Sequence, residues 1–162
     1  MSHWVQGLSW ARQSERPKAM PIGRPRGAKA AGVRFERLVA KAMPQAKHGL
    51  WWEFVDASGR HWCQTDLVLE GRDSVLVVEC KYTWTRDAQR QLEGLYLPVV
   101  SWVRGKPAYG VQLCKVLTPE ATGVCPTLED ALALARSGAA ATWHWIPGTP
   151  LRTRSEQFPQ AA

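Results

Sequence analysis

Two carboxylates and one amine interrupt an apolar stretch of this 162-residue sequence. Residues 61–70 and 74–82 each predict a short strand, and the Gly-Arg-Asp-Ser sequence that joins them predicts a turn. The polar exceptions are Asp66 on the first strand and Glu79 and Lys81 on the second. Because side chains alternate across a strand, Glu79 and Lys81 share a face, and Asp66 can lie across the hairpin from them. Such charges at the edge of an apolar sheet are costly unless a cation or a reaction uses them, so they are candidate catalytic residues.

These residues resemble the motif of the PD-(D/E)xK nuclease superfamily. Asp66 matches the first acidic residue and Glu79-Cys80-Lys81 matches the E-x-K, while Thr65 stands where the motif often has proline. The resemblance implies Mg2+-dependent hydrolysis of DNA, with Mn2+ able to substitute. It implies that Asp66, Glu79 and the main-chain carbonyl of Cys80 hold the metal. It also implies that Lys81 holds the attacking water or balances charge at the phosphate. A surface hairpin with an exposed ion pair is the alternative.

A helix is predicted to begin near Lys29 and to end at Pro44, because the apolar positions between them follow a helical period. Glu36 lies near the edge of its apolar stripe. In many members of the superfamily a helix before the first strand supplies a glutamate to the metal site. The resemblance therefore implies a catalytic role for Glu36, and a solvated helix residue is the alternative.

The sequence predicts further elements on both sides of the hairpin: a strand at 49–55, a helix at 85–97, strands at 99–103 and 109–117, a helix at 127–138 and an edge strand at 143–146. The first six elements follow the order helix, three strands, helix, strand, which is the core order of the superfamily. We therefore expect an α/β protein with a restriction-endonuclease-like α-β-β-β-α-β core over about 29–104. Its mixed central sheet would be flanked by helices, with an extra C-terminal strand, helix and strand.

The predicted helix at 85–97 carries Gln89 and Gln91 before Tyr96. Some exonuclease-like members have a Gln-x-x-x-Tyr motif on this helix. The spacing to Tyr96 is three residues too long from Gln89 and one too long from Gln91, which argues against an exonuclease. Gln89 shares a helix face with Tyr96 and is a predicted DNA contact, with simple packing at the helix edge as the alternative.

Residues 1–28 predict a flexible basic arm. Together with Lys29 they hold six basic residues and one acidic residue, which gives +5 of the net charge of +7. The sequence Gly-Arg-Pro-Arg-Gly at 23–27 resembles the core of an AT-hook. Arg24, Arg26 and Lys29 are therefore predicted DNA contacts, with a solvated linker as the alternative.

The rest of the chain predicts one nuclease domain over 29–146 and a loose tail over 147–162. Four cysteines without a C-x-x-C pair favour reduced, buried thiols, with zinc bound by His61, Cys63 and Cys80 as the alternative. No apolar run reaches transmembrane length and the N-terminus lacks a signal-peptide core. A cytoplasmic protein, or a phage-encoded one acting in the host cytoplasm, is expected.

These features predict a structure-specific DNA endonuclease of the recombination, repair or phage type. The alternatives are an exonuclease, a restriction-like endonuclease that depends on sequence or base modification, and a non-catalytic DNA-binding module with a nuclease fold. The expected partner is DNA and not a membrane. The resemblance to dimeric junction resolvases implies a homodimer.

Overall fold

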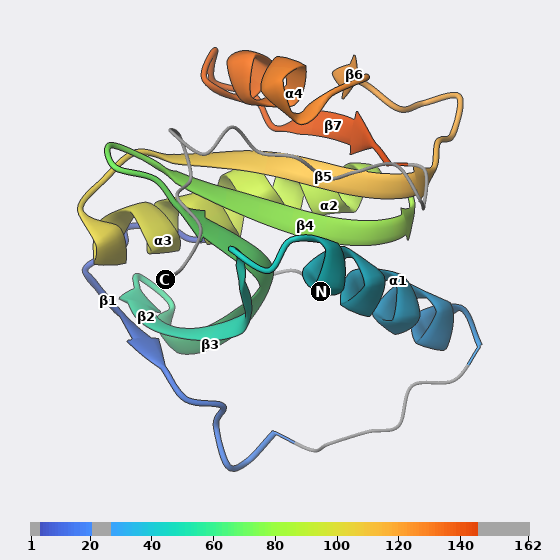
Figure 1. Cartoon of the computed structure of the whole chain (residues 1–162). Coiled ribbons are helices and arrows are strands. Elements are labelled where there is room, and N and C mark those ends of the chain that lie inside the picture. The colour runs from blue at the N-terminus through green and yellow to red at the C-terminus, as the bar shows by residue number, and fades with distance from the viewer. Residues whose placement is uncertain (1–3, 21–26, 146–162) are drawn as a thin grey trace.

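The computed structural model describes residues 4–20 and 27–145. Within these residues the chain is a mixed α/β protein in which helices flank one seven-stranded mixed sheet (Figure 1). The elements in chain order are β1 (Trp10–Ser14), α1 (Ala28–Ala42), β2 (Lys47–Asp56), β3 (Gly59–Glu70), β4 (Val75–Thr83), α2 (Arg86–Gln91), η1 (Leu92–Tyr96), α3 (Leu97–Arg104), β5 (Ala108–Val116), β6 (Val124–Cys125), α4 (Leu128–Ala135) and β7 (Ala141–His144).

The strands lie in the order β1-β2-β3-β4-β5-β7-β6. The pairs β1–β2, β2–β3 and β3–β4 are antiparallel. The pairs β4–β5, β5–β7 and β7–β6 are parallel, so β4 lies where the sheet changes from antiparallel to parallel. The change from antiparallel to parallel pairing follows from how the strands are connected. Short turns join β2 to β3 and β3 to β4, while the helical segment from α2 to α3 carries the chain back between β4 and β5.

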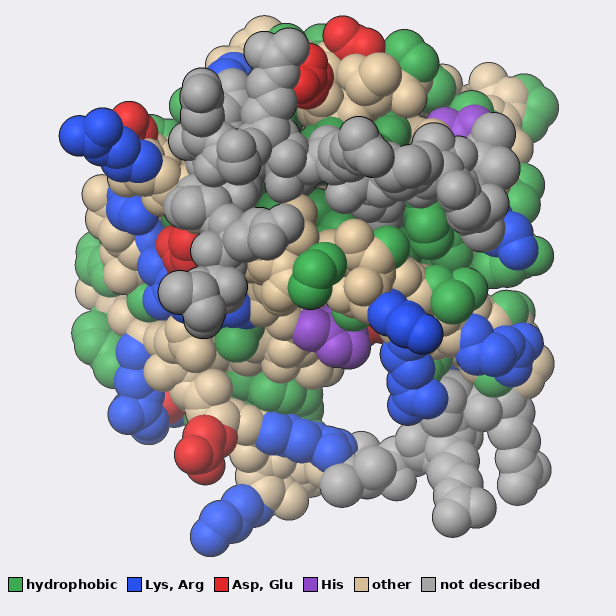
Figure 2. Space-filling view, in the orientation of Figure 1, with side chains coloured by type: hydrophobic (Ala, Val, Ile, Leu, Met, Phe, Trp, Pro, Cys, Tyr) green, Lys and Arg blue, Asp and Glu red, His purple; other side chains and the backbone are tan. Residues whose placement is uncertain are grey.

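Each face of the sheet has its own apolar core. On one face α1 and α4 pack over the strands and bury Phe35 and Leu132. On the other face η1 and α3 cover the sheet and bury Leu92 and Val100. Residues 75–78 of β4 are buried between the two cores, which explains their uninterrupted apolar sequence. On the surface, Lys and Arg side chains gather in the lower part of the view in Figure 2.

The hairpin of β3 and β4 is paired over part of its length. Its register runs from Glu70↔Val75 to Leu67↔Val78. Before Leu67, β3 continues its pairing with β2, and after Val78, β4 continues its pairing with β5. The two strands therefore part directly beyond the pair Leu67↔Val78.

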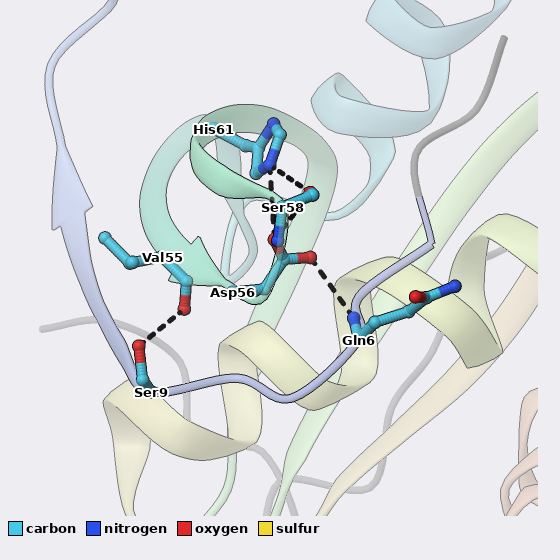
Figure 3. A network of polar contacts seen from close by, with 6 residues as sticks. All are labelled: Gln6, Ser9, Val55, Asp56, Ser58 and His61. Atoms are coloured by element: carbon cyan, nitrogen blue, oxygen red, sulfur yellow. Dashed lines mark hydrogen bonds and ion pairs between the residues drawn. The ribbon is translucent and has the colours of Figure 1, made fainter.

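The sequence Asp-Ala-Ser-Gly at 56–59 predicts a turn, and the structure has that turn between β2 and β3, anchored by Asp56. Its Oδ1 accepts hydrogen bonds from the backbone N–H and the hydroxyl of Ser58, at 2.8 and 2.7 Å. Its Oδ2 accepts the N–H of Gln6 at 3.1 Å, which ties the N-terminal segment to the turn (Figure 3). Gly59 completes the turn with φ at 124°, a conformation that side chains disfavour.

The predicted strand at 99–103 is wrong, because these residues belong to α3. Val99 and Val103 are one helical turn apart, so a short apolar run fits either structure. Pro98 lies in the first turn of α3, where a missing N–H is tolerated. Gly105 ends the helix in the left-handed conformation with φ at 62°. The final strand of the predicted core order is β5 instead.

The expectation of an arm without fixed structure is wrong for residues 10–14, which form β1 and pair with β2. Their polar sequence does not indicate a strand, and pairing with β2 stabilises them as an edge strand of the sheet. The strand predicted at 143–146 is β7, and it lies between β5 and β6 rather than at the edge. Its parallel neighbours are far away in sequence, so no local pattern could show this.

Other predictions hold or fall outside the described residues. The strand β5 is confirmed, as is helix α4, whose N-cap Thr127 accepts the N–H of Asp130 at 3.1 Å. Thr85, a residue type that favours helix N-caps, is the N-cap of α2, and its side chain accepts the N–H of Ala88. The segment 21–26 and the predicted tail at 147–162 lie outside the described residues. No helix among those that the structure describes is long and apolar enough to cross a membrane.

Candidate active site

The three residues of the predicted motif lie where β3 and β4 part. Asp66 and Glu79 are the first residues beyond the last strand pair, one on each strand. Lys81 follows on β4, and a hollow of about 490 Å³ that Asp66, Lys81 and Glu36 help to line opens beside the first turns of α1.

Hydrogen bonds and an ion pair hold these groups in place. Asp66 Oδ2 accepts the backbone N–H of Cys80 at 2.7 Å, so a side chain satisfies a donor where the strands part. Lys81 Nζ lies 2.7 Å from Glu79 Oε1. Glu79 is 2% exposed, and its Oε2 is buried without a hydrogen-bond partner within the described part of the chain. A side-chain hydrogen bond with Asp66 also lowers the pKa of Glu79, so a cation bound to this oxygen would lie beside both carboxylates.

The carboxylates of the site disfavour one another's charge. Burial raises the pKa of Asp66 well above its usual range, and the charges of Glu79 and Glu36 raise it further. Burial also raises the pKa of Glu79, although Lys81 opposes the shift. Burial alone would lower the pKa of Lys81, but Glu79 and Asp66 outweigh it and the pKa lies above its usual value. Lys81 alone therefore does not neutralise the charges of Asp66, Glu79 and Glu36.

Glu36 lines the hollow from α1, and its predicted catalytic role stays a prediction. Its Oε1 lies 2.6 Å from Nε2 of His48 at the start of β2. Its charge also acts on Asp66. Glu36 is therefore beside the site, and His48 is a partner that the sequence did not indicate.

The residues fit a hard cation such as Mg2+ that is held by few protein ligands. Among residues 4–20 and 27–145, no group of three or more His, Cys, Asp or Glu side chains is placed to hold a metal. The predicted site does not require one, since it uses Asp66, Glu79 and the carbonyl of Cys80, and Mg2+ usually keeps several waters. A cation would relieve both the repulsion between the carboxylates and the unpartnered oxygen of Glu79. The Cys80 carbonyl stays a prediction.

The predicted DNA contacts are separated in the structure. Lys29 lines the hollow from the first turn of α1. Arg24 and Arg26 lie outside the described residues. Gln89 Nε2 donates to the carbonyl of Thr122 at 3.4 Å and to Oγ1 of Thr142 at 3.3 Å, which joins α2 to the far end of the sheet. This position removes the reason to expect a DNA contact from Gln89.

The structure pairs Gln91 with Tyr96. Gln91 Nε2 donates to the Tyr96 hydroxyl at 2.7 Å. An α-helix would turn residues with this spacing away from each other, but η1 is a π-helical turn, whose i→i+5 pattern brings them together. Burial raises the pKa of Tyr96, and the charges of Glu79 and Asp66 raise it further. The sequence argument against a contact between Gln91 and Tyr96 assumed a regular α-helix, in which residues five apart do not meet.

Two other groups of side chains, Asp56 with Ser58 and His61, and Cys63 with Cys80, contain residue types found in catalytic or metal sites, but their arrangement in the structure does not fit such a site. Ser58 Oγ lies 2.8 Å and Asp56 Oδ1 lies 3.3 Å from the same nitrogen of His61, Nε2 (Figure 3). A catalytic triad needs the hydroxyl and the carboxylate on different ring nitrogens, so this cluster is not one. Cys63 and Cys80 lie in separate cores on opposite faces of the sheet, which removes the zinc alternative.

Comparison with protein-family models, with curated proteins and with solved structures gives no match. The function is therefore inferred from the site itself.

Proposed function

We propose that this chain is a Mg2+-dependent DNA nuclease with a restriction-endonuclease-like core. One observation carries the proposal: Asp66, Glu79 and Lys81 converge where β3 and β4 part, and a buried Glu79 oxygen there has no hydrogen-bond partner among the described residues. The element order α1-β2-β3-β4-α2-β5 supports it, because it is the core order of the superfamily whose motif these residues resemble.

In this proposal Asp66 and Glu79 bind the cation, with the Cys80 carbonyl as a further ligand. When bound, Mg2+ supplies a Lewis acid for the phosphate and a more acidic water. Lys81 keeps its proton at neutral pH because its pKa lies above the usual value. It therefore acts as a positive charge and hydrogen-bond donor toward the phosphate, and not as a general base. Mn2+ should replace Mg2+, since both accept oxygen ligands.

Glu36 and Lys29 extend the proposed site along α1. Both line the hollow beside Asp66. Glu36 would bind a second cation or an outer water, and its hydrogen bond with His48 fixes its direction. Lys29 would contact a DNA phosphate from the first turn of the helix.

The substitution Lys81→Ala tests the proposal most directly. It should reduce Mg2+-dependent cleavage by about a thousandfold or more, because it removes the positive charge that faces the phosphate. The melting temperature should fall, because the buried Glu79 loses its ion pair, but the variant should remain folded at the assay temperature and bind DNA in EDTA close to the wild-type level. Lys41→Ala is the matched control, since Lys41 is exposed on the last turn of α1 and does not line the hollow. Full Mg2+-dependent cleavage by Lys81→Ala would overturn the assignment.

A panel of labelled DNAs identifies the substrate: linear duplex, nicked circle, flap, four-way junction and single strand, each with Mg2+, Mn2+ or EDTA. A structure-specific endonuclease cuts the flap or the junction internally, and a junction resolvase should be a dimer because two strands are cut symmetrically. Binding without cleavage of any DNA would favour the non-catalytic module.

The contact between Gln91 and Tyr96 favours a second candidate, an exonuclease. Some exonuclease-like members of the superfamily carry a Gln and a Tyr on the equivalent helix, and the π-helical turn brings this pair together despite its longer spacing. End-labelled and internally labelled linear DNA separate the candidates, because an exonuclease releases the terminal label first.

A further inference from the structure

The outer face of β1, β2 and β3 carries aromatic and basic side chains in adjacent rows. One row is Arg12, Glu53 and Trp62, and the next begins with Trp10 and ends with Arg60. We call these five side chains the platform. The alternate residues of the same strands face the core beneath η1 and α3, so the platform is the solvent side of the sheet.

Glu53 holds both arginines of the platform. Its Oε2 accepts from Arg12 Nε at 2.7 Å, and its Oε1 lies 3.2 Å from Nη1 of Arg60. Glu53 is buried, while both arginine side chains are 62% exposed. A guanidinium has five N–H groups, so each arginine keeps donors that Glu53 does not use. Two oriented positive charges against one negative charge suit a phosphate ligand.

The tryptophans of the platform offer exposed rings beside these charges. Trp62 is 36% exposed and Trp10 is 40% exposed. The guanidinium of Arg12 lies 5.6 Å from the centre of the Trp10 ring, which holds the two side chains together. Indole rings next to arginines on an open sheet can stack on unpaired bases while the arginines bind the phosphates.

A hollow of about 820 Å³ opens over the platform, between the three strands and the segment 15–19. Its lining holds three basic side chains, Arg12, Lys18 and Arg60, and two acidic ones, Glu15 and Glu53, of which Glu53 is paired with both arginines. The space and its charge therefore suit an extended polyanion.

Strand β3 connects the platform with the candidate active site. Trp62, Gln64 and Asp66 are alternate residues of β3 that are exposed or half-exposed, whereas Cys63 and Thr65 between them are buried. Trp62 lies four residues before Asp66, a distance of about 13 Å along an extended strand. A strand of nucleic acid on the platform could thus reach the site without leaving this side of β3.

We propose that the platform binds single-stranded DNA and directs it to the site at Asp66. The choice of DNA depends on the proposed nuclease function, whereas the choice of a single strand depends on the platform itself. Stacking on Trp62 and Trp10 requires unpaired bases, and the bases of a duplex already stack on one another.

Anisotropy with labelled oligo-dT and with a duplex of equal length, both in EDTA, tests the proposal without cleavage. Trp62→Ala and Arg60→Ala should each weaken oligo-dT binding about tenfold and duplex binding less than about twofold. Trp62→Phe should restore most of the affinity, because a phenyl ring still stacks. Trp102→Ala and Arg136→Ala are matched controls at exposed positions away from the platform and should leave binding unchanged. Melting temperatures check that each variant is folded.

Unchanged oligo-dT binding in folded Trp62→Ala and Arg60→Ala would overturn the proposal, as would equal losses in the control variants. Tighter binding of oligo-U than of oligo-dT would overturn the choice of DNA. A failure of the proposed nuclease function can be distinguished from a failure of the platform proposal. Loss of the platform contacts changes affinity, whereas Lys81→Ala should bind oligo-dT normally and lose only cleavage.

Discussion

Glu53 and Glu79 are strand carboxylates with the same exposure, 2%, and opposite surroundings. Glu53 forms ion pairs through both oxygens, with Arg12 and Arg60. Glu79 pairs with Lys81 through one oxygen, and its other oxygen has no hydrogen-bond partner among the described residues. A buried charge is therefore not in itself a sign of chemistry. A buried carboxylate that the fold leaves partly unsatisfied is a better candidate for metal binding or catalysis.

The position of each strand in the sheet explains the difference. Glu53 lies in β2 between two paired strands, and β1 and β3 each present an arginine to it. Glu79 has β5 on one side, but β3 has parted from β4 on the other. The gap brings Asp66 to Glu79 as a second carboxylate rather than a basic partner.

The largest expected difference is between Glu79→Gln and Glu53→Gln. Glu79→Gln should reduce Mg2+-dependent cleavage about a thousandfold or more if Glu79 is the metal ligand that we propose, while the melting temperature stays the same or rises. Glu53→Gln should lower the free energy of unfolding by about 1–2 kcal/mol through loss of its charged hydrogen bonds. Its cleavage rate at saturating DNA should remain within about threefold of the wild type. Thermal unfolding and single-turnover cleavage measure both effects.

The contrast fails if the two variants behave alike. Loss of cleavage in folded Glu53→Gln at saturating DNA would mean that the ion pairs of Glu53 serve the reaction. A stable, fully active Glu79→Gln would mean that the parted strands are not the active site.

Asp66→Asn should stabilise the protein in EDTA at pH 7, with a rise in melting temperature of about 2–4 °C. The pKa of Asp66 is raised in the folded state, so the folded protein binds this proton more tightly than the unfolded chain. The resulting stability is present at low pH and is lost as the pH rises through the raised pKa. The advantage of Asp66→Asn should therefore shrink as the pH falls toward about 4.

Mg2+ completes this test and Asp73→Asn is its control, since Asp73 is exposed in the turn between β3 and β4. Mg2+ should raise the melting temperature of the wild type and of Asp73→Asn at pH 7, and should not raise that of Asp66→Asn. If Asp66→Asn melted at a lower temperature than the wild type and Mg2+ still raised that temperature, Asp66 would be neither an unfavourable buried charge nor a Mg2+ ligand.

The smallest expected effect is that of Tyr96→Phe, which changes the surroundings of Glu79 and leaves those of Glu53 intact. The loss of the hydroxyl leaves Gln91 without its hydrogen bond and should cost about 1 kcal/mol of unfolding free energy. Cleavage should fall by less than about tenfold if the pair only positions the site. Tyr109→Phe is the control on β5. A loss as large as that of Lys81→Ala would show that Tyr96 takes part directly in catalysis.

Several elements were predictable because their signals are local. The Asp-Ala-Ser-Gly turn, the caps at Thr85 and Thr127, and the end of α1 near Pro44 each depend on neighbouring residues. The run at 99–103 was not predictable, since its apolar spacing fits a strand and a helix equally. The strand at 10–14 was not predictable either, because it depends on pairing with residues about forty positions later.

The sequence by itself determined the paired apolar strands and the three charged residues Asp66, Glu79 and Lys81, because alternation and turn residues act over a few positions. Only the tertiary structure decided that β3 and β4 part at these residues and that Glu36 joins them from α1. It also decided that a π-helical turn joins Gln91 to Tyr96. Strand separation and helix placement depend on packing across the whole sheet, which no local spacing encodes.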